Sequence, residues 1–113
     1  MSDHLLMSGR VLELVAQRFK LLSEPSRLRL LELLLEGEKS VGELAQAMGT
    51  HQANISHQLG MLADGGLIMR RREGAHIIYR ISDTSLTRLS ELVCNSLQSQ
   101  GEADLCLLKG ERS

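Results

Sequence analysis

The stretch that most constrains the fold covers residues 40–68, where two short helical patterns stand on either side of a glycine. Ser40 followed by Glu43 is a capping-box pattern, which predicts a helix that starts at Val41 and ends at Gly49. Apolar residues at helical spacing predict one buried side on each helix. These residues are Val41, Leu44 and Met48 in the first helix, and Ile55, Leu59 and Leu62 in the second.

The second helix is expected to be capped by Thr50 and to end at Asp64-Gly65-Gly66. Polar side chains without a negative charge crowd its first two turns. Gln and Asn can bond bidentately to adenine, and Ser or His can reach phosphates or base edges. We therefore predict a helix-turn-helix that enters the major groove of DNA, with a merely solvated polar face as the alternative. The polar residues are His51, Gln52, Asn54, Ser56, His57 and Gln58.

Length and composition favour one helical domain. The chain has 113 residues, of which 2% are aromatic, so the core must come from Leu, Val, Ile and Met. The net charge of −1 argues against a nucleic-acid partner until its distribution is considered. Residues 50–80 carry four Arg against two acids, whereas both flanking segments carry more acids than bases. The excess of positive charge is thus confined to the predicted helix-turn-helix and the segment after it. We call this helix-turn-helix the reading unit and its second helix the reading helix.

Two helices are expected before the reading unit. Apolar residues recur at helical spacing over residues 4–22, on a face wide enough to suggest contact with a second subunit. Ser23 and Pro25 then resemble the cap and first turn of a Leu-rich core helix that runs to Gly37. Arg27 and Arg29 are expected on its outer surface.

A β-hairpin is predicted directly after the reading helix. Residues 67–72 and 76–81 favour strands, and Gly74 stands at the turn between them. The apolar residues expected to attach the hairpin to the core are Leu67, Ile77, Tyr79 and Ile81. A hairpin in this place is a wing, whose arginines can lie along phosphates or enter the minor groove. Its positive exterior consists of Arg70, Arg71, Arg72 and Arg80.

A last helix is expected from Ser85 to about Gln100, with caps offered by residues 82–84. Its narrow apolar seam is typical of a helix that pairs with another helix. We predict that this helix and the first one form a two-fold dimer, with reading helices roughly 34 Å apart. Residues 1–100 would then form the DNA-binding and dimerisation domain, and residues 101–113 a loosely ordered tail. The seam consists of Leu86, Leu89, Val93 and Leu97.

Membrane and enzyme functions are disfavoured. No apolar run approaches the roughly 20 residues of a membrane span, and the start lacks a secretion signal, so a cytoplasmic protein is expected. No Ser-His-Asp set, paired-carboxylate pocket or phosphate-binding Gly loop indicates an enzyme. A winged helix that docks another protein is the remaining alternative, although such a module needs no basic hairpin.

From about Phe19 to Ile81 the chain resembles the ArsR/SmtB family of bacterial winged-helix repressors. The resemblance lies in FKLLSEPSRLRLLELLLEGEKSVGELAQAMGTHQANISHQLGMLADGGLI and in RRREGAHIIYRIS. It implies a mainly α winged helix-turn-helix, with four helices, a two-stranded wing and a fifth helix. It also implies a homodimer that binds double-stranded DNA at a palindromic operator and leaves it when an inducer binds. The implied DNA-facing residues are His51, Gln52, Asn54, Ser56 and His57.

The resemblance does not identify the inducer, because the positions that bind inducers in known members hold other residues here. Where some members bind arsenite or soft metals through cysteines, this chain has Ser40, Gly42 and Ala45. Where others bind zinc between the paired last helices, it has Asp83, Ser85, Ser96 and Ser99. One carboxylate alone will not hold zinc. A third group uses a cysteine of the core helix, which has none here.

Cys94 and Cys106 remain as candidates for sensing an inducer. Reduced thiols are the default expectation in a cytoplasmic chain. An unbroken helix would separate the two by about 18 Å, too far for a disulfide, but Gly101 could break it. The thiols could then form a redox switch or, shared across subunits, part of an arsenite or soft-metal site that controls stress genes. Alternatively, both cysteines are structural and the repressor is metal-independent.

Overall fold

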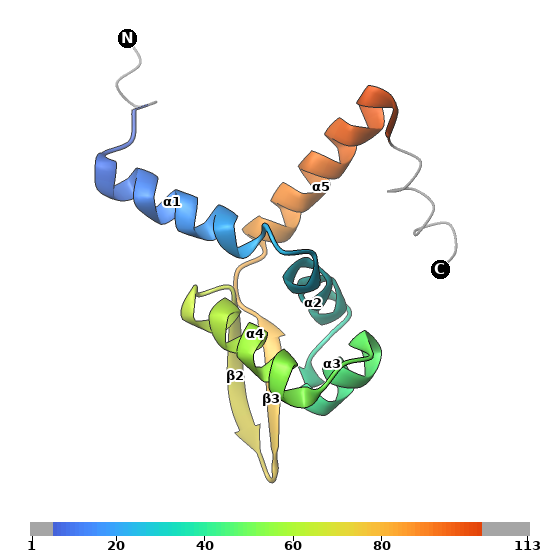
Figure 1. Ribbon diagram of the computed structural model, residues 1–113. Coiled ribbons are helices and arrows are strands. Elements are labelled where there is room, and N and C mark those ends of the chain that lie inside the picture. The colour runs from blue at the N-terminus through green and yellow to red at the C-terminus, as the bar shows by residue number, and fades with distance from the viewer. Residues whose placement is uncertain (1–5, 103–113) are drawn as a thin grey trace. The chain divides into compact units, whose positions relative to one another are not determined.

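The computed structural model describes residues 6–102. The chain divides after Ser82 into two compact units. The first unit holds four helices and a small antiparallel sheet (Figure 1). The second unit holds one helix and a turn. The helices of the first unit are α1 Gly9–Leu21, α2 Pro25–Leu35, α3 Val41–Met48 and α4 Gln52–Asp64, and its strands are β1 Lys39–Ser40, β2 Ile68–Glu73 and β3 His76–Ile81.

The two helices before the reading unit form, with starts that differ from the prediction. Helix α1 begins at Gly9, where Ser8 accepts a hydrogen bond from the Val11 N–H at 3.2 Å; residues 4 and 5 lie outside the described part. Pro25 occupies the first turn of α2 as predicted, but Ser23 does not cap this helix. The Ser23 hydroxyl instead donates to the Lys20 carbonyl at 2.7 Å, because the end of α1 leaves that acceptor without a helical partner.

The helix-turn-helix follows its local signals closely. The Ser40 hydroxyl accepts from the Glu43 N–H, and the Glu43 carboxylate accepts from the Ser40 N–H, so the predicted capping box is confirmed. Gly49 ends α3 in the left-handed region, at φ +68°. The prediction that Thr50 caps α4 was wrong. The Thr50 N–H closes α3 by donating to the Ala45 carbonyl, so the helix begins one residue later, with His51 at the cap position.

One apolar core holds the first unit together. The predicted stripe of α4 is fully buried and packs with leucines of α2 and α3. At the base of the hairpin Leu67, Ile68 and Tyr79 are buried, whereas Ile77 and Ile81 are only half-buried. Val41 and Met48 of α3 are half-buried as well. The side chains that no water reaches are Leu30, Leu44, Ile55, Leu59, Leu62 and Leu67.

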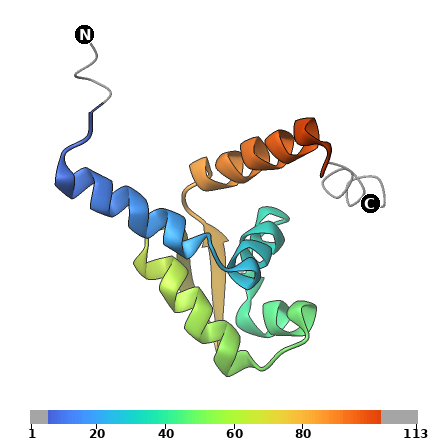
Figure 2. The same cartoon turned by 45° about the horizontal axis from the view of Figure 1, so that its top comes forward.

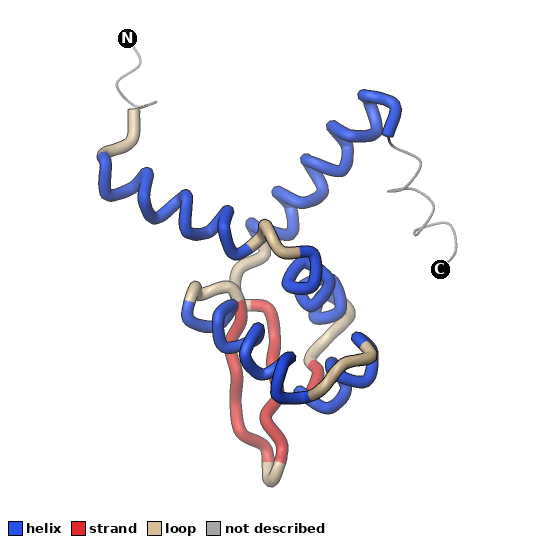
Figure 3. Tube along the Cα trace, in the orientation of Figure 1, coloured by secondary structure: helices blue, strands red, loops and turns tan. Residues whose placement is uncertain are grey.

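The predicted hairpin is confirmed, and it belongs to a three-stranded sheet of order β1-β3-β2. Gly74 makes its turn at φ +64°. The short strand β1, which the sequence analysis missed, pairs Lys39 with Tyr79 and Ser40 with Ile78. Helix α4 lies across one face of the hairpin (Figure 2), and the turn of the hairpin projects beyond the helices (Figure 3). The hairpin is therefore anchored at its base and exposed at its tip.

The second unit contains helix α5, Ser85–Leu97, followed by a π-helical turn, Gln98–Glu102. The α-helix therefore ends three residues before the predicted Gln100, and Gly101 lies in the left-handed region at φ +92°. Val93 and Leu97 of the predicted seam are 53% and 38% exposed, and the neighbouring Leu92 is 65% exposed. Across residues 6–102 no helix has the length and apolar character that crossing a bilayer requires.

Candidate DNA interface

The first two turns of α4 carry the predicted reading residues. His51, Gln52, Asn54, Ser56 and His57 are all exposed, whereas the stripe of Ile55, Leu59 and Leu62 is buried. No acidic residue lies in the first turn of this helix. The start of α4 therefore presents to solvent several polar side chains that donate and accept hydrogen bonds.

Gln58 differs from its polar neighbours because it is half-buried. Its side-chain carbonyl accepts a hydrogen bond from the Ser26 hydroxyl of α2 at 2.8 Å. This bond ties the reading helix to the core helix across 32 residues of sequence, so no local pattern could reveal it. Asn54 also has a neighbour, since its amide donates to the Thr50 hydroxyl at 3.3 Å. The structure thus separates Gln58, whose side chain joins α4 to α2, from the exposed polar residues of the same helix.

Strand register divides the wing arginines between two faces. Arg70 pairs with Tyr79 and Arg72 with Ile77, so both arginines share the face of the buried Ile68. This is the face that packs against the helices, including α4. Arg71 and Arg80 lie on the other face, because side chains alternate along a strand. Only Arg70 and Arg72 therefore stand on the same side as the reading helix.

Arg71 is held by two carboxylates of its own chain. Its guanidinium lies 2.8 Å from Glu38 Oε2 and 3.2 Å from Glu73 Oε2. The hydrogen bond to Glu38, followed by the one to Glu73, raises the pKa of Arg71 above its ordinary value. Glu38 precedes β1, and the sequence analysis missed its part in the wing because the two residues are far apart in the chain. Much of the Arg71 charge is thus balanced before any phosphate arrives.

Of the two arginines of α2 that were predicted to lie on its outer surface, one is exposed and the other is not. Arg27 is half-buried rather than on the outer surface, and its Nε donates to the Leu21 carbonyl at 2.8 Å. Arg29 is exposed and pairs with Glu32 at 2.6 Å. Arg27 was misplaced because the chain turns back at the end of α1 and leaves carbonyl acceptors beside it.

Cys94 is half-buried on α5 and is disulfide-bonded, so the default expectation of a reduced thiol was wrong for it. Cys106, the only other cysteine of the chain, lies outside the described residues. The left-handed Gly101 removes the unbroken helix that would hold the two positions about 18 Å apart. Within residues 6–102, no three His, Cys, Asp or Glu side chains come together as a metal-ligand set.

An exposed, acid-free helix tip, a short helix crossing behind it and a basic hairpin beside it define a winged helix-turn-helix DNA-binding domain. A family described as a helix-turn-helix domain matches residues 22–71. The chain belongs to the ArsR/SmtB family of winged helix-turn-helix transcriptional regulators.

Known relatives support this assignment. The chain is 42% identical over 78 residues to the HTH-type transcriptional regulator Rv0081 of Mycobacterium tuberculosis, covering 68% of each protein. It is 37% identical over 84 residues to the transcriptional repressor SmtB homolog of Synechocystis, covering 74% of this chain and 64% of that one. The solution structure of Mb0332 from Mycobacterium bovis, a homodimeric winged helix-turn-helix DNA-binding domain, superposes with a TM-score of 0.72 at 35% identity. That match covers 88% of this chain and 93% of Mb0332.

Proposed function

We propose that this regulator is a cytoplasmic homodimeric repressor that reads a palindromic DNA operator with two copies of α4 and leaves it when an inducer acts. The observation that carries the proposal is the exposed, acid-free tip of α4, backed by a fully buried apolar stripe. Such a tip can enter the major groove without bringing a carboxylate near the phosphates.

In this proposal the residues of the tip have separate tasks. Gln52 and Asn54 present amides suited to adenine, and His57 and Ser56 reach base edges or phosphates. His51, at the cap position, faces the backbone beside the helix N-terminus, where the N–H groups also favour phosphate. Arg70 and Arg72 supply the wing contact, because they stand on the side of α4.

The apolar surface of the terminal helices supports a dimer. Val11, Leu12 and Phe19 of α1 are 41%, 55% and 54% exposed, and Val93 and Leu97 of the α5 seam are 53% and 38% exposed. Apolar patches of this kind mark interaction sites in soluble proteins. We assign dimerisation to both helices, with Leu86, Leu89, Val93 and Leu97 in the contact. A two-fold dimer would place the reading helices roughly one turn of DNA, about 34 Å, apart. The domain then spans residues 1–100, and residues 101–113 form a tail.

For the inducer we favour a thiol-reactive species that acts through Cys94 and Cys106, because Cys94 is disulfide-bonded. Arsenite or a soft metal would need the same cysteines reduced. Operator affinity should therefore differ between protein treated with diamide and with dithiothreitol. Cys94→Ser should lose that difference. If oxidised and reduced wild-type protein bind DNA equally, the cysteines are structural.

DNA binding itself is tested with duplexes from the region upstream of the coding sequence. Gln52→Ala combined with His57→Ala should abolish sequence-specific binding while the protein stays folded, since both side chains are exposed. Arg10→Ala, on the exposed side of α1, is the matched control and should bind normally. A protein that shifts no upstream DNA at low salt, or a double variant that binds like wild type, would contradict the proposal.

A further inference from the structure

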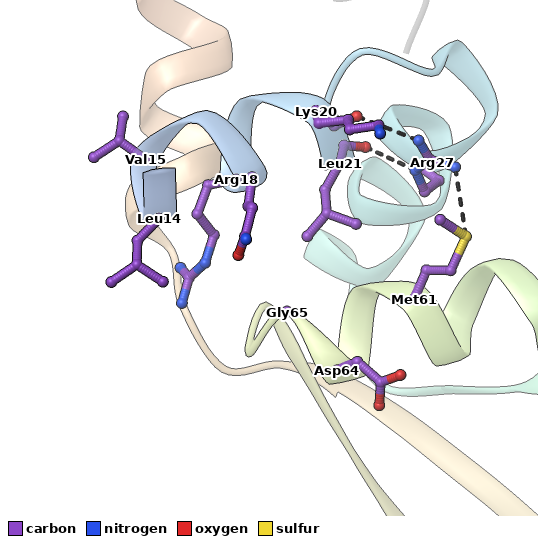
Figure 4. Close-up of a pocket in the computed structure, with 10 residues that line it drawn as sticks. Leu14, Val15, Arg18, Lys20, Leu21, Arg27, Met61, Asp64 and Gly65 are labelled. Atoms are coloured by element: carbon purple, nitrogen blue, oxygen red, sulfur yellow. Dashed lines mark hydrogen bonds between the residues drawn. The ribbon is translucent and has the colours of Figure 1, made fainter. Parts of the chain in front are cut away.

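A pocket of about 680 Å³ lies within the first unit, between α1, the start of α2 and the end of α4 (Figure 4). Cavities of this size hold small organic ligands. Nothing in the proposed DNA contacts uses this pocket. Its apolar lining consists of Leu14, Val15, Leu21 and Met61.

Positive side chains outnumber negative ones around the pocket. Arg18, Lys20 and Arg27 line it, against a single carboxylate from Asp64, which points away from α1 in Figure 4. A neutral apolar molecule would gain nothing from these charges. An anion with an apolar body would satisfy both the lining and its charge.

The pocket joins the end of α1 to the end of the reading helix. Arg27 fixes the last turn of α1 by donating to the carbonyls of Leu21 and Lys20, and its Nη1 lies 3.8 Å from Met61 Sδ of α4. A Cβ on Gly65 would overlap Leu21 Cδ1, so α1 approaches the turn that ends α4 as closely as a glycine allows. A molecule lodged beside this contact would press on both helices at once.

We propose that this pocket binds an amphipathic organic anion, a carboxylate with an apolar body, as an effector of the regulator. The anion is recognised by Lys20 and Arg18, and its apolar part lies against the lining from α1 and Met61. Occupancy shifts the end of α4 relative to α1 and weakens operator binding. This last step rests on the proposed repressor function, whereas binding of the anion does not.

Binding is tested without DNA, by calorimetry on the full chain with octanoate as the probe and 1-octanol as its uncharged counterpart. Octanoate should bind about tenfold or more tightly than octanol, since a hydrogen bond to a charged group supplies that difference. Arg18→Gln combined with Lys20→Gln should remove the preference. Arg10→Gln, on α1 outside the pocket, should retain it. Gln17→Trp, which fills the pocket from an exposed position, should block both probes.

Equal affinity for the two probes, or an unchanged preference in the double variant, overturns the anion site. So does a Kd for octanoate weaker than about 10 mM, the result expected if a second copy of α1 covers the pocket in the dimer. The coupling to DNA is measured separately. Saturating octanoate should lower operator affinity, and operator DNA should lower octanoate affinity by the same factor. Binding without this reciprocal effect overturns the effector role while leaving operator recognition intact.

Discussion

The helix-turn-helix and the wing are neighbours in sequence and in space, yet their residues take their roles from different sources. In α3 and α4, helix caps and the spacing of apolar residues decide which side chains are buried and which are exposed. Both of these signals lie within a few residues of the side chains that they affect. In the wing, three consecutive arginines look alike in sequence, but register and a distant carboxylate divide them.

This difference shows where local chemistry suffices to assign a function. The tip of α4 is a DNA-reading candidate because its polar side chains are exposed while the apolar stripe of the same helix is buried. Arg71 is a weaker candidate than Arg70 or Arg72 because strand register places it on the other face of the wing and because Glu38, from the segment before β1, reaches its guanidinium.

The largest effect is expected from the stripe that presents the reading helix. Leu59 is fully buried, so Leu59→Ala removes apolar contacts and leaves a cavity. The free energy of unfolding should fall by about 2–5 kcal/mol, measured by urea denaturation. Met69→Ala, at a half-exposed position of β2, is the control and should change it by about 0.5 kcal/mol or less. If the two variants lose equal stability, the tip of α4 does not depend on its buried stripe.

The second-largest effect is expected on DNA affinity and its salt dependence, when arginines of the wing are removed. Arg70→Ala with Arg72→Ala should weaken binding to any duplex and reduce the slope of log K against log salt by about 2, one phosphate contact each. Arg71→Ala should reduce that slope by clearly less, because Glu38 and Glu73 already balance its charge. Titrations at several salt concentrations measure both. Equal slopes for Arg71→Ala and Arg72→Ala would show that DNA displaces the carboxylates and that the two faces of the wing are equivalent.

Most of the fold could be predicted because its determinants are local. The capping box at Ser40, the glycine at position 49 and the stripe of α4 all act within one or two helical turns. The errors lie at junctions, where two elements compete for one group. Thr50 closes α3 rather than opening α4, and Ser23 binds the end of α1 rather than the start of α2.

The site could be predicted less completely, for the same physical reason. Exposure of His57 follows from helical periodicity, whereas the bond between Ser26 and Gln58 joins positions far apart in the chain. The pocket beside Gly65 is likewise built from three helices. In the sequence, lining residues such as Leu14 and Met61 cannot be told from ordinary apolar helix positions, because only the folded chain brings them together.

Removing a cap of the helix-turn-helix should have a smaller effect on stability than removing a core leucine. Ser40→Ala deletes the hydroxyl that accepts from the Glu43 N–H, and caps of this kind contribute about 1 kcal/mol. Urea denaturation should show that loss, and Ser40→Thr should recover most of it. A loss as large as that of Leu59→Ala would mean that Ser40 supports more than the start of α3.

The smallest effect is expected from Glu43→Gln, and it should change the stability of the fold only at acidic pH. The Ser40 N–H and hydroxyl bind the Glu43 carboxylate and lower its pKa below the ordinary 4.5. A carboxyl group with a lowered native pKa stabilises the fold at pH values above its unfolded pKa, and that contribution is lost as pH falls through the native value. Wild type should therefore lose more stability than Glu43→Gln between neutral pH and the region below 4.5. Because the side chain is exposed, the difference should be small and should shrink in salt. Parallel curves for the two proteins would mean that the amide caps α3 as well as the carboxylate, leaving the hydrogen-bond geometry, rather than the charge, as the local signal that starts this helix.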